Sequence, residues 1–541
     1  MLTRRQFGSL IALTSLSVSL PQFLAAAPAP QAITFAIESE PTTLNPHLNG
    51  QAKARVVLRN LYDSLLARDE KGGYLPWLAQ SYEASADGLT FDFHLRPGVN
   101  FHNGEALDAA ALVVNFEHLR DPAYAANLAA GPASHLVKAE AIAPLHLRLT
   151  LAKPYAPFLG FAAGVDILAP SAYRSEQLKS GGPEVAGSGP FLIDTIAKGQ
   201  EIRLRRNPDY AWAPANAEHQ GPAYLEAVTF RILPESAVRV GALQSGQVDA
   251  IEGISGNDVA LFRDDEGFSY ISAFNTGTPY TLFLNSQSGP TAEQAVRKAL
   301  RAAIDIPAVL QSIYRGERQR AWGISSPIEA DLYDPAIENA WAFDPAEANR
   351  LLDEAGWTER DAAGLRAKNG TPLVIRIVQA QATVRDQRDV LLLALQAQAR
   401  QNAGIQLELD YVDAGSYAER RKLGDYGSIP NSRTPADDGI DIEYHYLPLD
   451  EGGSVNYARV ADPQVKAWLT QAAATSDLAA RHALYAKVQD FVLREQGYAL
   501  PIYVPEDQIA ARADLTGLRF RPYFQQPDSL HGVRFDSEVA G

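Results

Sequence analysis

The sequence contains no cysteine, and its single methionine is the first residue. The absence of cysteine excludes disulfides, thiolate zinc sites, iron–sulfur clusters and cysteine nucleophiles. A chain that lacks both easily oxidised side chains beyond its start suits an oxidising compartment, although codon bias explains the same composition.

Basic residues are outnumbered, with 48 Lys and Arg against 64 Asp and Glu and a formal net charge of -16. An acidic surface argues against nucleic-acid and anionic-membrane partners, because both need basic patches to offset phosphate charge. The length of 541 residues exceeds one compact core, so two or three domains are expected. Hydrophobic residues form 46% of the chain, an ordinary share for a globular protein.

Residues 1–32 have the three-part pattern of an export signal. Arg4 and Arg5 form a basic start, an apolar stretch covers 10–20, and small residues fill 25–29. A transmembrane anchor fits poorly, because Pro21 interrupts an apolar run already shorter than the roughly 20 residues that span a bilayer. We therefore expect a cleavable signal and a periplasmic, soluble product.

The export route is left open by the sequence. Residues 3–7, Thr-Arg-Arg-Gln-Phe, resemble the twin-arginine signature, whereas Gly8 and Ser9 depart from it. The missing cysteine removes any site for lipid attachment.

Alternating and helical patterns follow one another along the chain. Hydrophobic residues alternate with polar ones over 91–95 and 145–151, which predicts two strands with a helix capped by Asp108 between them. Further on, Asp344 is placed to cap a helix that Gly356 ends. Strand 373–378, helix 386–402 and strand 405–411 then predict a parallel pair with a crossover, and a last helix is expected over 478–494.

Several short segments share their order and spacing with one protein family. They are Pro-Trp-Leu-Ala at 76–79, the long segment 87–104, Gly-Ser-Gly-Pro-Phe at 187–191, Arg-Asn-Pro-Asp-Tyr at 206–210, and the segments 243–249, 296–305 and 351–357. In these segments the chain resembles family 5 bacterial extracellular solute-binding proteins, which serve peptide, nickel and opine importers. One departure is the run of alanines at 109–111, where family members usually carry an acidic pair.

Some details are similar to the nickel-binding branch, at 44–48, 155–159, 356–358 and 368–373. In that branch an arginine-bearing loop helps to hold the chelate. The corresponding segment here, 162–166, reads Ala-Ala-Gly-Val-Asp and has no arginine, which puts nickel in doubt.

The resemblance implies a two-lobed α/β fold like the periplasmic binding proteins, a Venus flytrap of type II from the large cluster with an extra subdomain. The first lobe is expected to use 33–75, 187–275 and 507–541. A subdomain at 76–186 would insert into it, and the second lobe would span 276–506.

Ligand-binding candidates follow from where such proteins bury their ligand. Glu38 and Thr42 follow the first strand and should face the cleft from the first lobe. Arg433, Asp437 and Asp438 lie where peptide-binding relatives place an amine-holding aspartate, although these charges could equally pair with each other in a solvated loop.

An aromatic run and a turn complete the candidates. Tyr444, His445 and Tyr446 could stack on a ligand or bind a metal chelate, and the alternative is a half-buried strand. Gly277 and Pro279 lie at the expected crossing between lobes and could set a hinge, with an ordinary loop as the alternative.

Catalysis finds little support in the sequence. It has no Gly-x-Ser-x-Gly elbow, no His-Glu-x-x-His and no phosphate-cradling loop, and its ten histidines lack metal-ligand spacing. We therefore expect no enzyme activity, no cofactor and no metal site, with a secreted hydrolase as the alternative from another class.

The expected function is capture of a small peptide-like ligand and its delivery to the inner-membrane permease subunits of an ABC importer. Nickel held by an organic chelator, a metallophore, is the second ligand class, and opines or oligosaccharides are the third. A monomer without nucleic-acid partners is expected, and a chaperone role is conceivable as a side activity.

Overall fold

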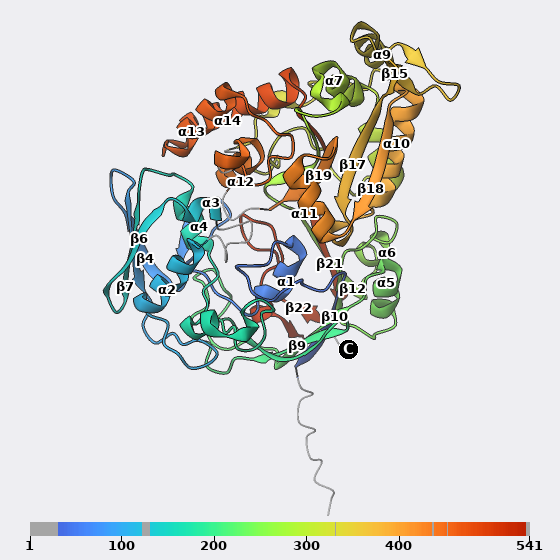
Figure 1. Ribbon diagram of the computed structural model, residues 1–541. Coiled ribbons are helices and arrows are strands. Elements are labelled where there is room, and N and C mark those ends of the chain that lie inside the picture. Colours follow the sequence, from blue (N-terminus) through green and yellow to red (C-terminus); the bar gives the residue numbers. More distant parts are fainter. Residues whose placement is uncertain (1–30, 122–129, 330–331, 435–437, 452, 537–541) are drawn as a thin grey trace, which may run out of the picture. The chain divides into compact units, whose positions relative to one another are not determined.

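The computed structural model describes residues 31–121, 130–329, 332–434, 438–451 and 453–536. The predicted export signal lies almost wholly outside them. From residue 31 the chain builds three larger sheets, which alternate with helices along the sequence (Figure 1).

A seven-stranded mixed sheet carries the first lobe, which we call lobe I. Its strands in spatial order are β12 (Phe268–Phe274), β21 (Glu506–Arg512), β11 (Ala250–Glu252), β1 (Ala32–Ile37), β10 (Ala227–Ile232), β9 (Glu201–Arg206) and β8 (Phe191–Ala197). Strand β1 pairs in parallel with both β10 and β11. The crossover from β10 to β11 includes helix α5 (Ser236–Gln244), so these three strands end at one edge.

A four-stranded antiparallel sheet, β4 (Ala79–Ala84), β5 (Thr90–Leu95), β7 (His146–Leu151) and β6 (Leu136–Ala143), forms an inserted subdomain of lobe I. Phe91, Phe93 and Leu95 are buried on one face of β5, as the alternation predicts. Helix α2 (Ala109–Leu119) packs on this sheet, and the Asp108 carboxylate accepts a hydrogen bond from the Ala111 amide at 2.9 Å. Ala109 and Ala111 are buried, so small side chains fit this helix start.

The Gly-Ser-Gly segment joins the subdomain to β8 through close backbone contact. A Cβ atom on Gly187 would lie 2.1 Å from the Leu61 carbonyl oxygen, and one on Gly189 would lie 2.5 Å from the Leu61 carbonyl carbon. Only glycine permits this approach. The Ser188 hydroxyl between them donates to the buried Asp63 carboxylate at 2.9 Å.

A five-stranded sheet carries lobe II, with the order β18 (Gln406–Val412), β17 (Val374–Ala380), β19 (Ser428–Arg433), β13 (Thr278–Leu284) and β20 (Ala499–Tyr503). Strands β17 and β18 are parallel, with Ile375 opposite Leu407. Helix α10 (Arg388–Ala403) connects them, which confirms the predicted crossover. Helix α9 (Pro345–Glu354) begins after Asp344, whose carboxylate accepts from the Glu347 amide at 2.9 Å.

The other helices cover these sheets. In lobe I they are α1 (Arg55–Leu58), α3 (Ala130–Ala133), α4 (Phe158–Gly164) and α6 (Ala260–Arg263). In lobe II they are α7 (Gln294–Ala302), α8 (Ile306–Tyr314), α11 (Ala414–Leu423), α12 (Asp438–Tyr446), α13 (Pro463–Ala473) and α14 (Leu478–Gln489), which continues into a π-helical turn over Asp490–Glu495. Three small sheets pair β2 (Leu66–Arg68) with β3 (Tyr74–Pro76), β22 (Leu515–Thr516) with β23 (Arg534–Phe535), and β15 (Arg366–Lys368) with β14 (Glu359–Arg360) and β16 (Thr371–Pro372).

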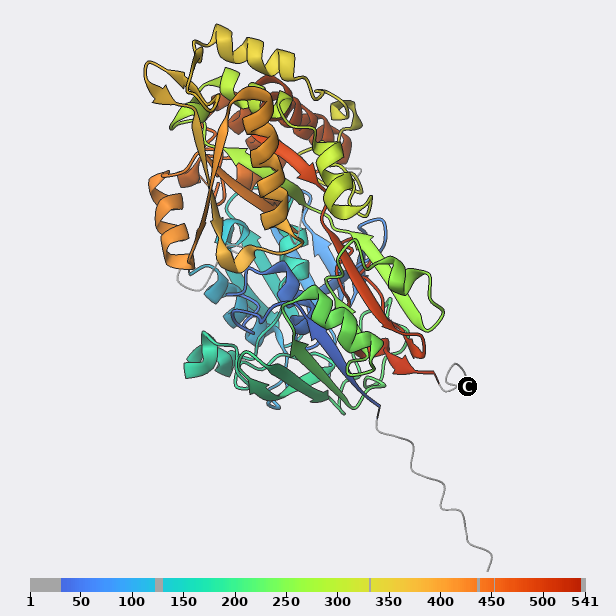
Figure 2. The ribbon, with the colours of Figure 1, turned by 90° about the vertical axis from the view of Figure 1, so that its right-hand side faces the viewer.

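The chain passes between the lobes at two neighbouring crossings. One joins β12 to β13 and the other joins β20 to β21, and both run along the same side of the two sheets (Figure 2). The Asn275 amide in the first crossing donates to the Pro505 carbonyl in the second at 2.9 Å. These paired crossings confirm the two-lobed α/β fold and place any hinge motion near them.

The inserted subdomain also contacts lobe II away from the crossings. The Tyr155 hydroxyl donates to the Glu443 carboxylate on α12 at 2.9 Å. The Ala156 amide donates to the Ala473 carbonyl on α13 at 2.7 Å. The lobes are therefore joined on both sides of the space between them.

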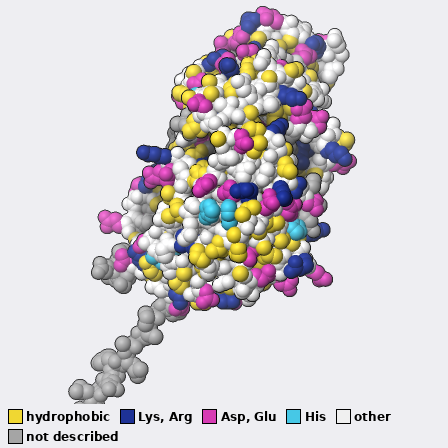
Figure 3. Space-filling view, turned by 90° about the vertical axis from the view of Figure 1, so that its left-hand side faces the viewer, with side chains coloured by type: hydrophobic (Ala, Val, Ile, Leu, Met, Phe, Trp, Pro, Cys, Tyr) yellow, Lys and Arg dark blue, Asp and Glu magenta, His cyan; other side chains and the backbone are white. Residues whose placement is uncertain are grey.

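Acidic, basic and hydrophobic side chains are interspersed over one face of the chain (Figure 3). Among the described residues, no helix has both the length and the apolar character that a membrane crossing requires. The hydrophobic residues instead form the cores of the lobes.

Helix α10 offers a matched test of this core. Leu391 is 0% exposed and Leu393 is 55% exposed on the same helix. Leu391→Ala should lower the free energy of unfolding by about 2–5 kcal/mol, because it leaves a cavity between α10 and the sheet. Leu393→Ala should change it by no more than about 0.5 kcal/mol. Urea unfolding followed by circular dichroism measures both, and equal losses would contradict the packing described.

Candidate ligand-binding site

A cavity of about 880 Å³ lies between the lobes. This volume is within the roughly 300–1,000 Å³ of small-molecule sites. Lobe I lines it with residues that directly follow three parallel strands: Glu38 after β1, the segment 234–237 after β10, and the segment 253–256 after β11. Carboxyl ends of parallel strands are the usual ligand edge of an open α/β sheet.

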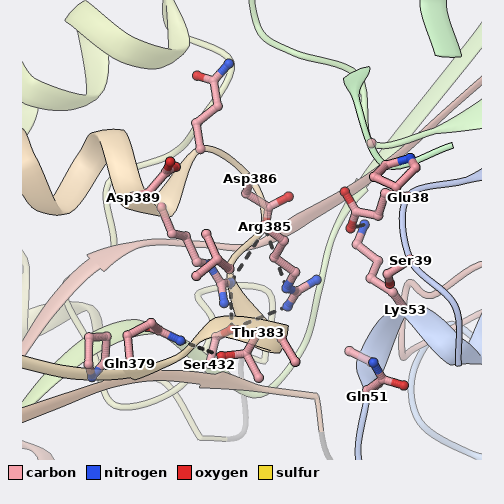
Figure 4. A pocket seen from close by; sticks show the side chains of 18 of the residues that line it. Glu38, Ser39, Gln51, Lys53, Gln379, Thr383, Arg385, Asp386, Asp389 and Ser432 are labelled. Carbon is pink, nitrogen blue, oxygen red and sulfur yellow. Dashed lines mark hydrogen bonds and ion pairs between the residues drawn. The ribbon is translucent and has the colours of Figure 1, made fainter. Parts of the chain in front are cut away.

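Lobe II presents the same kind of edge. The segment 381–389 follows β17, and Thr434 follows β19, which runs parallel to β17. Figure 4 shows Glu38, Ser39, Gln51 and Lys53 on one side of the cavity, across from the segment that carries Arg385 and Asp386. The two strand edges therefore enclose the space from opposite lobes.

The loop after β17 is held in an unusual backbone conformation. Asp386 and Gln387 have φ values of 52° and 55°, in the left-handed region that residues other than glycine rarely adopt. Strain of this kind concentrates at functional sites. Here it places Arg385 and Arg388 on the same wall of the cavity, before and at the start of α10.

Both arginines converge on Ser432 of β19. The Arg388 guanidinium donates to the Ser432 hydroxyl at 2.9 Å and to the Tyr503 hydroxyl at 2.9 Å. Arg385 reaches the same serine at 3.5 Å and lies 3.8 Å from the Asp386 carboxylate (Figure 4). Arg385 is therefore the more loosely held of the two and the better placed to meet a ligand anion.

The carboxylate of Asp386 offsets this positive charge only in part. Burial would raise the pKa of Asp386, but the cations of Arg385, Lys53, Arg388 and Arg318 outweigh burial and hold that pKa far below its usual range. Asp386 thus stays ionised, and its single negative charge offsets only part of the charge of the cations around it.

On the lobe I side, Lys53 is buried among carboxylates. Its ammonium lies 2.7 Å from Asp507 and 3.9 Å from Glu38. Burial lowers the pKa of Lys53, but Asp507 and Glu38 raise it further, to a value above its usual range. Burial raises the pKa of the neighbouring Glu252, and the charges of Glu38 and Asp507 add to that effect, against the opposing cation of Lys53.

This lysine is connected to both crossings. The second oxygen of Asp507 accepts from the Asn275 side-chain amide at 3.0 Å, and the Asn275 backbone amide binds Pro505. A side chain on the cavity wall is therefore linked through two residues to the segments about which the lobes would move.

The expected hinge residues lie at the first crossing. Gly277 has φ of 89°, which favours glycine, and its amide donates to the buried Glu329 carboxylate at 2.8 Å. Pro279 lies within β13, where its carbonyl accepts from the Thr281 hydroxyl at 2.9 Å. Their role in motion stays a prediction.

Of the other candidates, Glu38 and Arg433 line the cavity and Thr42 does not. Thr42 is exposed, and its amide donates to the side chain of Gln51, a cavity residue, at 2.7 Å. Asp437 lies outside the described residues. Asp438 is the first residue of α12, and its side chain is outside the description.

Tyr444, His445 and Tyr446 are placed differently from either expectation. They belong to helix α12 rather than a strand, and all three are buried away from the cavity lining. The His445 ring is stacked on Phe283 with ring centroids 4.6 Å apart, and its Nδ1 lies 2.8 Å from the Asp441 carbonyl oxygen. Burial lowers the pKa of His445. The run is aromatic because it forms core between α12 and β13.

Sequence reasoning missed Lys53, Arg385, Arg388 and Ser432. The signal for Arg385 and Arg388 was the predicted parallel strand–helix–strand unit, since its first strand must end at the ligand edge. Ser432 gave no signal of this kind, because it lies on β19, outside that unit. Lys53 gave no comparable signal. It lies in a short 3₁₀ turn (Ala52–Ala54), and the carboxylates of Glu252 and Asp507 that act on it are far away in the sequence.

The described residues contain no group of three or more His, Asp or Glu side chains placed to hold a metal ion. The cavity offers instead guanidinium, ammonium, carboxylate and hydroxyl groups on two facing walls. Fold and site together define a two-lobed binding protein with a polar cavity for a small molecule between its lobes.

Comparison with known proteins agrees with this class. The model of bacterial extracellular solute-binding proteins, family 5, matches residues 73–445, and the chain belongs to that family. The nickel-binding periplasmic protein of Escherichia coli K12 is 27% identical over 521 residues, covering 92% of this chain and 94% of that protein. The glutathione-binding protein GsiB of Escherichia coli O1:K1 is 26% identical over 526 residues, covering 94% and 96%.

Solved structures agree on the fold. The crystal structure of NikA from Brucella suis in complex with Fe(III)-EDTA superposes with a TM-score of 0.76 and 26% identity, covering 92% of this chain and 99% of that one.

The buried lysine gives a test of the lobe I wall. Lys53→Met should lower the free energy of unfolding by about 3–5 kcal/mol at pH 8, because it leaves buried carboxylates without their cation. A carboxyl group whose pKa is raised by folding stabilises the fold below its unfolded pKa and loses that contribution as the pH rises through the folded value. Burial raises the pKa of Glu252 in this way. The fall in the free energy of unfolding caused by Lys53→Met should therefore be smaller at pH 5 than at pH 8.

The control is Lys466→Met, whose exposed ammonium pairs with Glu451 at 2.6 Å. It should change the free energy of unfolding by no more than about 0.5 kcal/mol at either pH. Denaturant titrations at both pH values measure these changes. An effect of Lys53→Met that does not depend on pH would contradict the pairing of Lys53 with the buried carboxylates.

Proposed function

We propose that this chain is the solute-binding component of an ABC importer, which captures a peptide-like solute in the periplasm and delivers it to a membrane permease without converting it. The observation that carries the proposal is the cavity itself. Two lobes joined by paired crossings enclose about 880 Å³ between their strand ends, with fixed charges of both signs on the walls. Family membership supports the same function.

A peptide-like solute carries a carboxylate and an ammonium group, and the two walls offer a partner for each. On lobe II, Arg385 and the Ser432 hydroxyl would hold the carboxylate. On lobe I, the Glu38 carboxylate oxygen that lies 3.9 Å from the Lys53 ammonium is buried and receives no hydrogen bond from the described residues. A ligand ammonium would fill that requirement, since a buried carboxylate oxygen without a donor is unfavourable.

Such a ligand would bridge the lobes. Because its two ends contact different lobes, it binds the closed arrangement better than an open one and shifts the equilibrium toward closure. The link from Lys53 through Asp507 to Asn275 would transmit contact at the wall to the crossings. The closed form would then dock on the permease.

A metal chelate is a second candidate ligand, since relatives bind nickel and Fe(III)-EDTA. The specific observation in its favour is Arg55, which lines the cavity and lies 2.7 Å from Asp166. Arg55 therefore places a guanidinium next to the segment 162–166, which itself contains no arginine. It would contact an anionic chelator, and the protein would bind the metal through that chelator only.

Periplasmic location and a monomeric state complete the proposal. The basic, apolar and small-residue pattern of residues 1–32 supports export. The net charge of -16 disfavours association with nucleic acid.

Calorimetry and solution scattering test the proposal together. A panel of dipeptides, glutathione and nickel–histidine should include a binder that releases measurable heat and reduces the radius of gyration. Arg385→Gln should weaken that binder by about tenfold or more, because it removes a charged hydrogen bond. Arg376→Gln, an exposed β17 arginine that pairs with Asp425 outside the cavity, is the control and should bind as the wild type does.

Native mass spectrometry of the protein from its own periplasm should show a bound small molecule. Unchanged scattering and absent heat across the panel, with no co-purified compound, would overturn the proposed function. Conversion of a bound compound by the purified protein would contradict its non-catalytic part.

A further inference from the structure

We propose that the cavity selects peptide-like solutes with two carboxylates, and that Arg433 and Arg421 form a second carboxylate subsite on lobe II. The inference rests on the proposed function and names its substrate class. It comes from the distribution of charge between the two walls and from the contacts of these two arginines.

The cationic excess is confined to lobe II. Lobe I lines the cavity with three cations, Lys53, Arg55 and Arg239, and three anions, Glu38, Glu235 and Asp258. Lobe II lines it with five cations, Arg318, Arg385, Arg388, Arg421 and Arg433, and two anions, Asp386 and Asp389. In a chain of net charge -16 this local reversal of sign points to an anionic ligand.

Pairing within the protein accounts for only part of that excess. Arg318 lies 2.6 Å from Glu506, and Arg433 lies 2.8 Å from Asp441. The pair Arg385 and Arg388 shares Asp386, and Arg421 forms no ion pair with another described side chain. One positive charge is left beside Ser432 and a second on α11. The exposed carboxylate of Asp389 at the start of α10 offsets one of them in the sum, so the net excess of this wall is a single charge, and the second subsite is argued from the contacts of its donors.

Arg433 is held rigidly with a free donor. Its Nε donates to the buried Asp441 carboxylate, which also accepts from the Thr278 amide at 3.1 Å. Its guanidinium lies 5.1 Å from the centre of the Tyr444 ring. Its Nη2 atom is buried and makes no hydrogen bond to any described residue. A buried donor of this kind, on a cavity wall, calls for an acceptor from the ligand.

We assign Arg421 to the same subsite because it lines the same lobe II wall. It lies one helical turn after Tyr417 on α11, and both side chains line the cavity. Residues four apart share one face of a helix, so this face of α11 is directed to the cavity. The rigid donor of Arg433 and the unpaired charge of Arg421 together suit a second carboxylate, while Ser432 and Arg385 hold the first.

The test uses ligand pairs of nearly equal shape. Ala-Asp and Ala-Asn differ by one carboxylate, as do Glu-Gly and Gln-Gly, and glutathione is compared with its glycine amide. Calorimetry at low ionic strength should show the member with two carboxylates binding at least tenfold more tightly in each pair that binds. Added salt should reduce the difference, because part of it is electrostatic.

Variants assign the preference to the subsite. Arg433→Gln and Arg421→Gln should each reduce the preference to threefold or less, and Arg433→Lys should restore it only in part because lysine lacks the planar fork. Arg385→Gln should weaken both members of a pair by the same factor. Arg376→Gln is the control that keeps the preference, and circular dichroism verifies that each variant folds.

The outcomes separate this inference from the proposed function. Binding of both members with equal affinity overturns the second subsite and leaves the binding protein intact. A preference that survives in both Arg433→Gln and Arg421→Gln also overturns it. If no compound of the panel binds and the protein from its own periplasm carries no small molecule, the proposed function fails and the inference falls with it. Should Arg433→Gln not fold, Arg421→Gln alone decides, since no ion pair is lost there.

Discussion

The pairing of the two crossings constrains the rest of this structure. The Asn275 amide and the Pro505 carbonyl hold the segments that lead into and out of lobe II side by side. With both connections at one side, the lobes can meet along only one pair of sheet edges. Those edges are the carboxyl ends of parallel strands in each lobe, where backbone ends and loop residues leave room for polar side chains.

The charges on these edges explain how one cavity can hold a small polar molecule without water. A solute removed from solvent loses its hydration, so each of its polar groups needs a partner on the wall. The walls meet this requirement asymmetrically: lobe I balances its lysine and arginines with carboxylates, and lobe II keeps arginines in excess. The left-handed backbone at Asp386 and Gln387 keeps that excess in place.

Connections within the protein join this wall to the rest of the molecule. Asp507 contacts Lys53 through one oxygen and Asn275 through the other, so the wall and the crossing share a carboxylate. On the far side, Tyr155 of the inserted subdomain binds Glu443 of α12. The subdomain therefore does more than extend lobe I, because it provides a second contact between the lobes.

The sequence by itself determined the elements with strong periodicity and the class of protein. Phe91, Phe93 and Leu95 alternate because one face of β5 is buried, and residues 373–411 show a strand, a helix and a strand with apolar faces, which requires a parallel crossover. Glu38 could be placed at the cavity because it directly follows the first strand. Only the tertiary structure decided that Tyr444, His445 and Tyr446 are core, since a short aromatic run has the same appearance in a helix and in a strand. It also brought Lys53 to Asp507 and placed Arg421 and Arg433 on one cavity wall. These positions depend on segments up to several hundred residues away, and spacing along a chain carries no record of such contacts.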